Sequence, residues 1–269
     1  MRYVEMAPPP DLAPWLRCAW VFASSHVAEA PERIVPDGRP ELVVHAAEPF
    51  AELDEGGRAS PQASAIFAGQ LTRPLHLRAT GASLVVGLRF HPDGARAFLG
   101  RPLREANDRR VALEAIVPGS TRALARDAAA APDDTSRVEV AYELVRRRLA
   151  SAPAFVDAPV RRCVTSLEDD PRVPLEALLA IAGLGRRQLE RRFADAVGLA
   201  PAQLAAVLRF RRAFDLLERD ARRPWTEAAL AAGYYDQSHF IREFRRYVGC
   251  KPSEFFRERE GLAEALVQA

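Results

Sequence analysis

The sequence contains few cysteines, only one lysine and no long hydrophobic run. The three cysteines, Cys18, Cys163 and Cys250, lie far apart, so we expect neither a disulfide framework nor a cysteine-based zinc module. No stretch approaches the ~20 apolar residues that a helix needs to span a bilayer, and the N-terminus lacks the apolar core of a signal peptide. These absences predict a soluble, cytoplasmic protein that does not act in a membrane.

The five histidines also lack any recognisable metal-ligand spacing, so we expect neither a metal nor another cofactor. Three of them, His45, His76 and His91, lie on or beside expected strands, where a barrel could bring them together around a metal ion. Histidines with a purely structural role are the interpretation that we favour.

The length of 269 residues, with 48% hydrophobic positions, is enough for two domains with buried cores. The net charge of +2 conceals an asymmetry, because residues 171–261 hold 17 Lys and Arg against 12 Asp and Glu, whereas residues 1–170 hold 21 against 23. A basic C-terminal third indicates a polyanionic partner. A solvated helical face would give the same charge pattern.

Short β-branched and aromatic runs dominate residues 33–100, and turn sequences such as PDGRP, DEGG and HPDG separate them. This pattern predicts strands at 41–45, 64–68, 75–78 and 83–90 in a small antiparallel sheet or barrel. Helical patterns follow at 93–99, 113–116, 122–130 and 138–149, and we expect these helices to pack against the sheet or to form a dimer surface.

The segment EDDPRVP, residues 168–174, combines an acidic cluster with two prolines and predicts a domain boundary. The chain beyond it is helical by pattern, with short turns that describe a compact bundle. We therefore predict an α+β protein of two domains: residues 1–170 form a small antiparallel barrel or sheet with helices, residues 171–261 are all-α, and residues 262–269 are a tail. The expected helices of the second domain span 175–182, 186–196, 201–220, 225–232, 237–248 and 252–260.

Two segments of this second domain repeat each other. GLGRRQLERRFADAVGLAP and GYYDQSHFIREFRRYVGCKP align with an offset of 51 residues, so that Leu189 matches Phe240 and Phe193 matches Phe244. A short alanine-rich helix that ends in Gly183 or Gly233 precedes each segment. The repeated unit is a helix-turn-helix.

The residue types of the second helix in each unit suit DNA recognition. Residues four apart, such as Leu189 and Phe193, face the core and leave polar side chains on the outer face. Arg, Gln and Glu on such a face can hydrogen-bond guanine, adenine and the cytosine amino group in the major groove. The outer face holds Arg187, Glu190 and Arg191 in the first unit and Gln237, Ser238, Ile241 and Arg242 in the second.

Other basic residues near these faces are candidates for phosphate contacts, which set affinity without choosing sequence. They are Arg186, Arg192, Arg245, Arg246 and Lys251. The helix at 201–220 carries an apolar stripe and can act as a rigid spacer that holds the reading helices about one DNA turn, roughly 34 Å, apart. For Tyr234 and Tyr235, which follow the second turn glycine, we favour packing between helices over stacking on a base.

Residues 174–259 closely resemble the DNA-binding domain of AraC/XylS-type transcriptional regulators. The resemblance lies in LEALLAIAGLGRRQLERRFADAVGLAPAQL, in LRFRRAFDLL and in AALAAGYYDQSHFIREFRRYVGCKPSEFF. It implies two helix-turn-helix subdomains that bind adjacent major-groove segments. The base contacts that the resemblance implies are Arg187, Glu190 and Arg191 in the first reading helix and Gln237, Ser238 and Arg242 in the second. Two departures are Gly185 in place of the usual Ser cap, which weakens the helix start by a few tenths of a kcal/mol, and Ala228 in place of Ile or Val.

The N-terminal stretches IVPDGRPELVVH, GQLTRPLHLRATG and VVGLRFHPDGARAFLG resemble the cupin-like sensory domain of a subset of these regulators. This resemblance implies ligand sensing or dimerisation. Asp37, Glu41, Arg89 and His91 lie at expected strand ends and turns and are candidates for a ligand pocket, although Asp37 could simply form a turn. Some DNA-alkylation-responsive proteins of this superfamily use an N-terminal cysteine as a methyl acceptor, a role that Cys18 could take, but its flanking tryptophans favour a buried, inert thiol.

Together these features predict a sequence-specific DNA-binding transcriptional regulator that is controlled by a small-molecule effector or by homodimerisation, and that is not an enzyme. Its expected partner is double-stranded promoter DNA. Two alternatives stay open: a metal-dependent cupin-type enzyme that its helical domain tethers to DNA, and a ligand-independent dimeric architectural protein.

Overall fold

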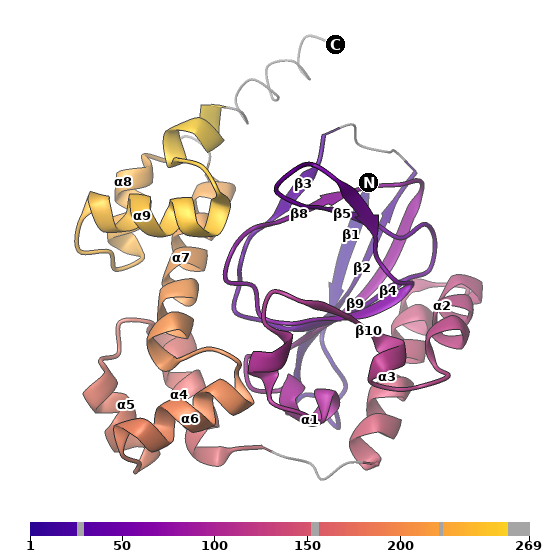
Figure 1. Ribbon diagram of the computed structural model, residues 1–269, viewed down its shortest axis with the longest axis horizontal. Coiled ribbons are helices and arrows are strands. Elements are labelled where there is room, and N and C mark those ends of the chain that lie inside the picture. Colours follow the sequence, from indigo (N-terminus) through magenta and orange to yellow (C-terminus); the bar gives the residue numbers. More distant parts are fainter. Residues whose placement is uncertain (26–29, 152–155, 221–222, 258–269) are drawn as a thin grey trace.

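The computed structural model describes residues 1–25, 30–151, 156–220 and 223–257 (Figure 1). The N-terminal part is built on two antiparallel sheets with helices, and the C-terminal part is helical. The two parts lie side by side, and helix α7 (Pro201–Arg219) runs between the pair α8–α9 and the group α4–α6 (Figure 1). The predicted α+β class and the two kinds of domain are confirmed.

The larger sheet has six strands in the order β1-β2-β9-β4-β7-β10, and the smaller has four in the order β3-β8-β5-β6. The strands expected at 41–45, 75–78 and 83–90 are confirmed, and the one expected at 64–68 begins one residue later. Strands β1, β2, β3, β5, β6 and β10 were not predicted. The bounds are β1 Arg2–Met6, β2 Leu16–Ser24, β3 Glu32–Ile34, β4 Glu41–His45, β5 Ala51–Leu53, β6 Ala59–Pro61, β7 Ala65–Ala68, β8 Leu75–Arg78, β9 Ser83–Phe90 and β10 Arg110–Ala112.

One face of the larger sheet forms the N-terminal core with helices. Alternate residues on its strands, such as Leu42 and Leu88, point to this face because side chains along a strand alternate between its two sides. The rings of Phe67, Phe90 and Phe98 meet there with centroids 5.6–6.2 Å apart. The covering elements are α1 (Ala95–Leu99), α2 (Thr121–Ala130) and α3 (Asp134–Ala150), with short 3-10 turns η1 (Leu103–Ala106) and η2 (Leu113–Ala115).

Helix α4 (Ala158–Asp169) belongs by packing to the C-terminal part. Its apolar residues Val160, Cys163, Val164 and Leu167 are buried in the same core as Phe193 on α6. The expected division at residue 170 would separate these side chains from the core that they help to form. We therefore propose that the boundary lies between the end of α3 and the start of α4.

The remaining helices are α5 (Leu175–Ala182), α6 (Arg186–Ala196), α7 (Pro201–Arg219), α8 (Trp225–Ala231) and α9 (Gln237–Val248), which agree with the predicted spans to within one residue. Residues 252–257 are also helical. The end of the helix expected at 252–260, and the tail at 262–269, lie outside the described residues. Within the described chain, no single helix is long and apolar enough to cross a membrane, and the α6–α7 pair that passes that test jointly is bent by 57°.

The N-terminal part packs directly on the helical part. The loop before β4 places Val35 in the helical core and turns at Gly38, which has a φ of 79°. A Cβ on Gly38 would lie 3.2 Å from Leu204 Cδ1 on α7. Farther along the contact, Asn107 donates a 2.6 Å hydrogen bond to the carbonyl oxygen of Gly198, just after α6. The N-terminal part therefore contacts both the connecting helix and the end of the first reading helix.

Candidate nucleic-acid interface

The first helix-turn-helix consists of α5, a turn at Gly183 and α6. Gly183 adopts a φ of 65°, a left-handed conformation that suits glycine because it carries no Cβ. Leu189 and Phe193 are fully buried, as their spacing of four predicted. The N-cap residue Gly185 makes no side-chain cap, which agrees with the weaker helix start expected from the sequence.

The outer face of α6 presents the predicted base-contacting residues. Arg187 and Arg191 are exposed, and neither makes a hydrogen bond or ion pair with another described residue. Glu190 is half-buried and accepts a 2.9 Å hydrogen bond from Arg186 Nε, one helical turn earlier. This exposed i,i+4 pair is weak, so DNA could displace it.

Arg192 does not fit the phosphate-binding role expected of it. Its Nε and Nη2 atoms donate to the two carboxylate oxygens of Asp157 at 2.6 and 2.7 Å. The Asp157 side chain is only 2% exposed, and it also caps α4 by accepting a hydrogen bond from the Val160 amide. A guanidinium committed to a buried carboxylate is poorly placed to bind a phosphate, so we remove Arg192 from the candidate phosphate contacts.

The second helix-turn-helix consists of α8, a turn at Gly233 (φ 92°) and α9. The Asp236 side chain caps α9 by accepting a 2.7 Å hydrogen bond from the His239 amide. Phe240 and Phe244 are fully buried, and the predicted base-contacting residues lie exposed on the other side of the helix. These residues are Gln237, Ser238 and Arg242, and the exposed phosphate candidates beside them are Arg245, Arg246 and Lys251.

The stretch between the turn glycine and the reading helix is one residue longer in the second unit than in the first, and its two tyrosines differ. Tyr234 is buried, with its ring 5.1 Å from that of Phe240, as expected for packing between helices. Tyr235 is 94% exposed, so the packing expected for it is wrong. The extra residue projects Tyr235 outward immediately before the cap of α9.

Helix α7 connects the two units and packs on both. Leu204 is buried near its start, and the Phe210 ring contacts Phe244 of α9 with centroids 6.0 Å apart. A continuous helix of 19 residues rises ~28 Å at ~1.5 Å per residue. This length is comparable with one turn of DNA, and the spacing of the two reading helices by about one DNA turn stays a prediction.

Three of the four residues proposed for a ligand pocket come together, but they bind one another. Arg89 Nε lies 2.8 Å from Glu41 Oε1 and 3.6 Å from Asp37 Oδ2, and Trp20 Nε1 donates to Glu41 at 3.1 Å. Burial raises the pKa of the Glu41 carboxyl, which the Arg89 charge opposes. His91 is not among their partners, and its amide instead donates to the Trp15 carbonyl oxygen.

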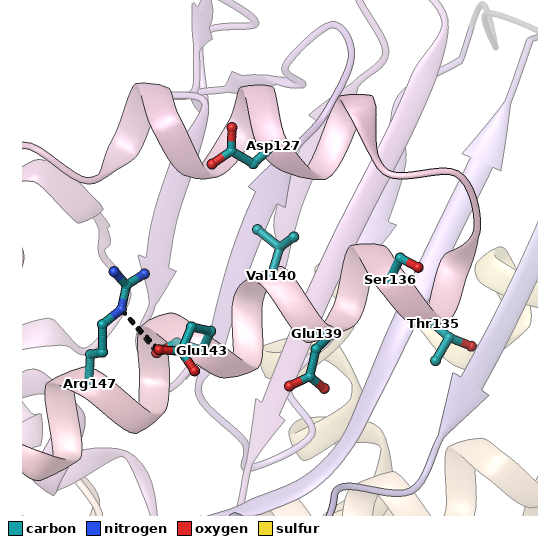
Figure 2. A pocket seen from close by; sticks show the side chains of 7 residues that line it. All are labelled: Asp127, Thr135, Ser136, Glu139, Val140, Glu143 and Arg147. Carbon is teal, nitrogen blue, oxygen red and sulfur yellow. Dashed lines mark hydrogen bonds and ion pairs between the residues drawn. The ribbon is translucent and has the colours of Figure 1, made fainter.

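Two hollows in the N-terminal part lie away from this cluster. A cavity of about 110 Å³ between the two sheets is lined by residues that include Phe22, Phe50 and Leu77. A shallow groove runs between α2 and α3, where Glu143 and Arg147 form a 3.5 Å ion pair (Figure 2). Neither hollow is lined by Asp37, Glu41, Arg89 or His91.

Two of the histidines considered as metal ligands form hydrogen bonds with other side chains, and Cys18 is not activated as a nucleophile. His45 Nε2 lies 3.0 Å from Gln62 Oε1, and His76 Nε2 accepts a 3.4 Å hydrogen bond from Arg33. In the described part of the chain, no group of three or more His, Cys, Asp and Glu side chains could hold a metal ion. Burial raises the pKa of the Cys18 thiol, which opposes its activation as a thiolate.

Comparison with known proteins separates the chain into the same two parts. Residues 178–258 match a family described as a helix-turn-helix domain. Residues 4–112 match a family described as a domain of unknown function (DUF6597).

A stretch of 99 residues, 37% of this chain, is 27% identical to the HTH-type transcriptional regulator MtrA of Neisseria gonorrhoeae and spans 32% of that protein's length. Two crystal structures of ToxT from Vibrio cholerae, one of them the K231A variant, each align with 88% of this chain and with 96–97% of their own, at 10–12% identity and a TM-score of 0.48. The C-terminal end of the chain therefore carries a helix-turn-helix domain, as predicted from the sequence, and part of the chain is similar to a helix-turn-helix transcriptional regulator.

Proposed function

We propose that this chain is a sequence-specific DNA-binding transcriptional regulator whose helical domain reads promoter DNA. The observation that carries the proposal is the duplicated helix-turn-helix. Each reading helix buries an apolar pair and exposes arginine and amide or hydroxyl side chains, and one continuous helix joins the two units. This arrangement suits two successive major-groove contacts on one side of a duplex.

In this proposal α6 reads bases with Arg187, Glu190 and Arg191, and α9 reads them with Gln237, Ser238 and Arg242. Arginine donates to guanine, glutamine pairs with adenine, and glutamate accepts from the cytosine amino group. Glu190 becomes available when DNA draws Arg186 away to a phosphate. Arg186, Arg245, Arg246 and Lys251 then supply affinity that depends on salt and not on sequence.

The N-terminal domain would control this reader through their direct contact. The loop at Gly38 packs on α7, and Asn107 holds the end of α6, so a change in the N-terminal domain can reach both reading units. A small-molecule effector or a homodimer partner would act by stabilising one arrangement of the two domains over another. A cupin-like sensor in a cytoplasmic regulator is the form of this control that the sequence suggests.

The competing function is a metal-dependent cupin-type enzyme whose helical domain holds it on DNA. Elemental analysis of the purified full-length chain separates the two functions. Stoichiometric iron, manganese or zinc would favour the enzyme.

The proposed function is tested by selecting bound duplexes from a random DNA pool with the full-length protein at two salt concentrations. We expect enrichment of a motif with two short blocks about one helical turn apart. A third possibility, an architectural protein, predicts binding with a low specificity ratio. Uniform binding that weakens steeply with salt, for the full chain and for residues 156–269 alike, would contradict a sequence-specific regulator.

A further inference from the structure

The carboxylate of Glu243, on the second reading helix, contacts side chains from α7, from the preceding turn and from α9 itself. Glu243 of α9 accepts a 2.6 Å hydrogen bond from the Tyr234 hydroxyl in the turn, and its other oxygen lies 3.2 Å from Arg209 Nη2 on α7. His239, one turn earlier on α9, places Nε2 3.2 Å from the same oxygen that Arg209 contacts. We call Arg209, Tyr234, His239 and Glu243 the Glu243 cluster.

The cluster is closed by contacts among its outer members. The Arg209 guanidinium lies over the Tyr234 ring at 5.0 Å from the centroid, and the Tyr234 and His239 rings meet edge to face at 5.2 Å. The side chains of Glu243 and Arg209 are only 15% and 16% exposed. Burial and the neighbouring carboxylate raise the pKa of Tyr234, so its hydroxyl keeps the proton that it donates. An ion pair with this little exposure is stronger and more directional than a surface pair.

The position of Glu243 relates the cluster to base reading. Consecutive residues on a helix are separated by 100°, so Glu243 flanks Arg242 on the side that turns toward α7. Rotation of α9 about its axis would therefore move Glu243 away from Arg209 and at the same time turn Arg242 and Ser238 relative to the groove. Apolar packing of Phe240 and Phe244 tolerates small rotations better than a charged pair does, because dispersion contacts have little directionality.

The first unit uses the same position for a similar contact. The 51-residue offset aligns Glu243 with Arg192, and Arg192 binds Asp157 at the start of α4. Both reading helices are thus anchored through an ion pair at the same repeat position, with opposite charge and to different helices. The first is tied to α4 and the second to α7.

We infer that Glu243 is the positioning residue of the second reading helix: through Arg209 it fixes the rotation of α9 and thereby determines which bases Gln237, Ser238 and Arg242 read. This inference rests on the proposed DNA-reading function. Glu243 acts through α9 and does not itself contact DNA.

The test uses the full-length protein and the same random-pool selection, scored separately for the two blocks of the motif. Glu243→Ala should keep the base preference of the first block and reduce that of the second at least tenfold. Val164→Ala is the matched control, because it truncates a buried side chain of the same core on α4, away from the cluster. Val164→Ala should lower the free energy of unfolding without changing the base preference of one block relative to that of the other.

A second arm measures the coupling. Glu243→Gln keeps the shape of the side chain and removes its charge, and it serves in place of the alanine variant if that variant does not fold. The double variant with Glu243→Gln and Arg209→Gln should change the base preference of the second block no more than the single variant with the larger effect does. Both substitutions break the same contact between Glu243 and Arg209, so their effects should not add. An unchanged second block, or additive shifts, would overturn the inference, whereas a wild-type protein that enriches no motif would overturn the proposed function itself.

Discussion

The Arg192 guanidinium on the first reading helix binds both carboxylate oxygens of Asp157, at 2.6 and 2.7 Å. Asp157 lies at the start of α4, so this pair ties α6 to α4. Arg192 is 31% exposed and Asp157 is 2% exposed, which places the contact at the edge of the helical core.

Asp157→Asn should lower the free energy of unfolding by about 1–3 kcal/mol, somewhat less than the loss of a fully buried ion pair. Asp157→Ala should cost about 1 kcal/mol more, since it also removes the cap on the Val160 amide. Urea unfolding followed by circular dichroism measures both. Asp127→Asn, which alters an exposed pair with Arg126, is the control and should change stability little.

Arginines on the reading helices should fall into two classes of effect. Arg191→Ala and Arg242→Ala should each relax base preference at one position of the motif, at a cost of about 1–3 kcal/mol in binding. Arg245→Ala should weaken binding to every duplex alike and reduce the salt dependence, as expected for a phosphate contact. Titration of specific and random duplexes at several salt concentrations distinguishes the classes. Equal losses on both duplexes for all three variants would refute these roles.

Arg192→Ala should leave the salt dependence of DNA binding unchanged, because its guanidinium is occupied by Asp157. The same titrations measure this, with Arg245→Ala as the matched comparison. A reduced salt slope for Arg192→Ala would instead restore Arg192 to the phosphate contacts and show that DNA breaks its pair with Asp157.

Gly38→Ala should disturb the contact between the domains. Gly38 has a φ of 79°, and an added Cβ would meet Leu204 of α7 at 3.2 Å. Gly57 is the matched control, since its φ of 78° imposes the same backbone strain and nothing lies within 4 Å of an added Cβ. Gly38→Ala should therefore cost more stability than Gly57→Ala, whose strain alone is about 1 kcal/mol. Identical thermal shifts would mean that the Gly38 loop does not press on α7.

Stability should fall as the pH drops below neutrality, in part through His45. Burial lowers the pKa of His45 below its usual 6.5, so the unfolded chain binds a proton that the folded chain does not. The resulting stability is present above pH 6.5 and is lost as the pH falls from there toward the folded-state pKa. Urea unfolding between pH 7.5 and 5 should give a flatter profile for His45→Gln than for the wild type. A residual slope is expected because burial also lowers the pKa of His76 and His91.

Much of the helical domain followed from local pattern. The 3.6-residue period of apolar positions and the turn glycines predicted α5, α6 and α9 to the residue, because these signals need no tertiary context. Helix α4 was missed, although Val160, Cys163, Val164 and Leu167 show helical spacing and Asp157 is a good cap. Strand β2 was missed as well, since its apolar residues occur on both faces and alternate weakly.

The sequence by itself determined the duplication, the apolar pair that buries each reading helix, and the arginine-rich outer faces, because all of these depend on residues a few positions apart. Tertiary structure decided which charged side chains remain exposed on the two helices that we propose to read DNA. Arg192 is paired with Asp157, which lies 35 residues away in the sequence. Glu243 is paired with Arg209, 34 residues away, and Glu41 with Arg89, 48 residues away. Such partners are set by how distant helices and strands pack, and the spacing of residues along the chain does not encode them.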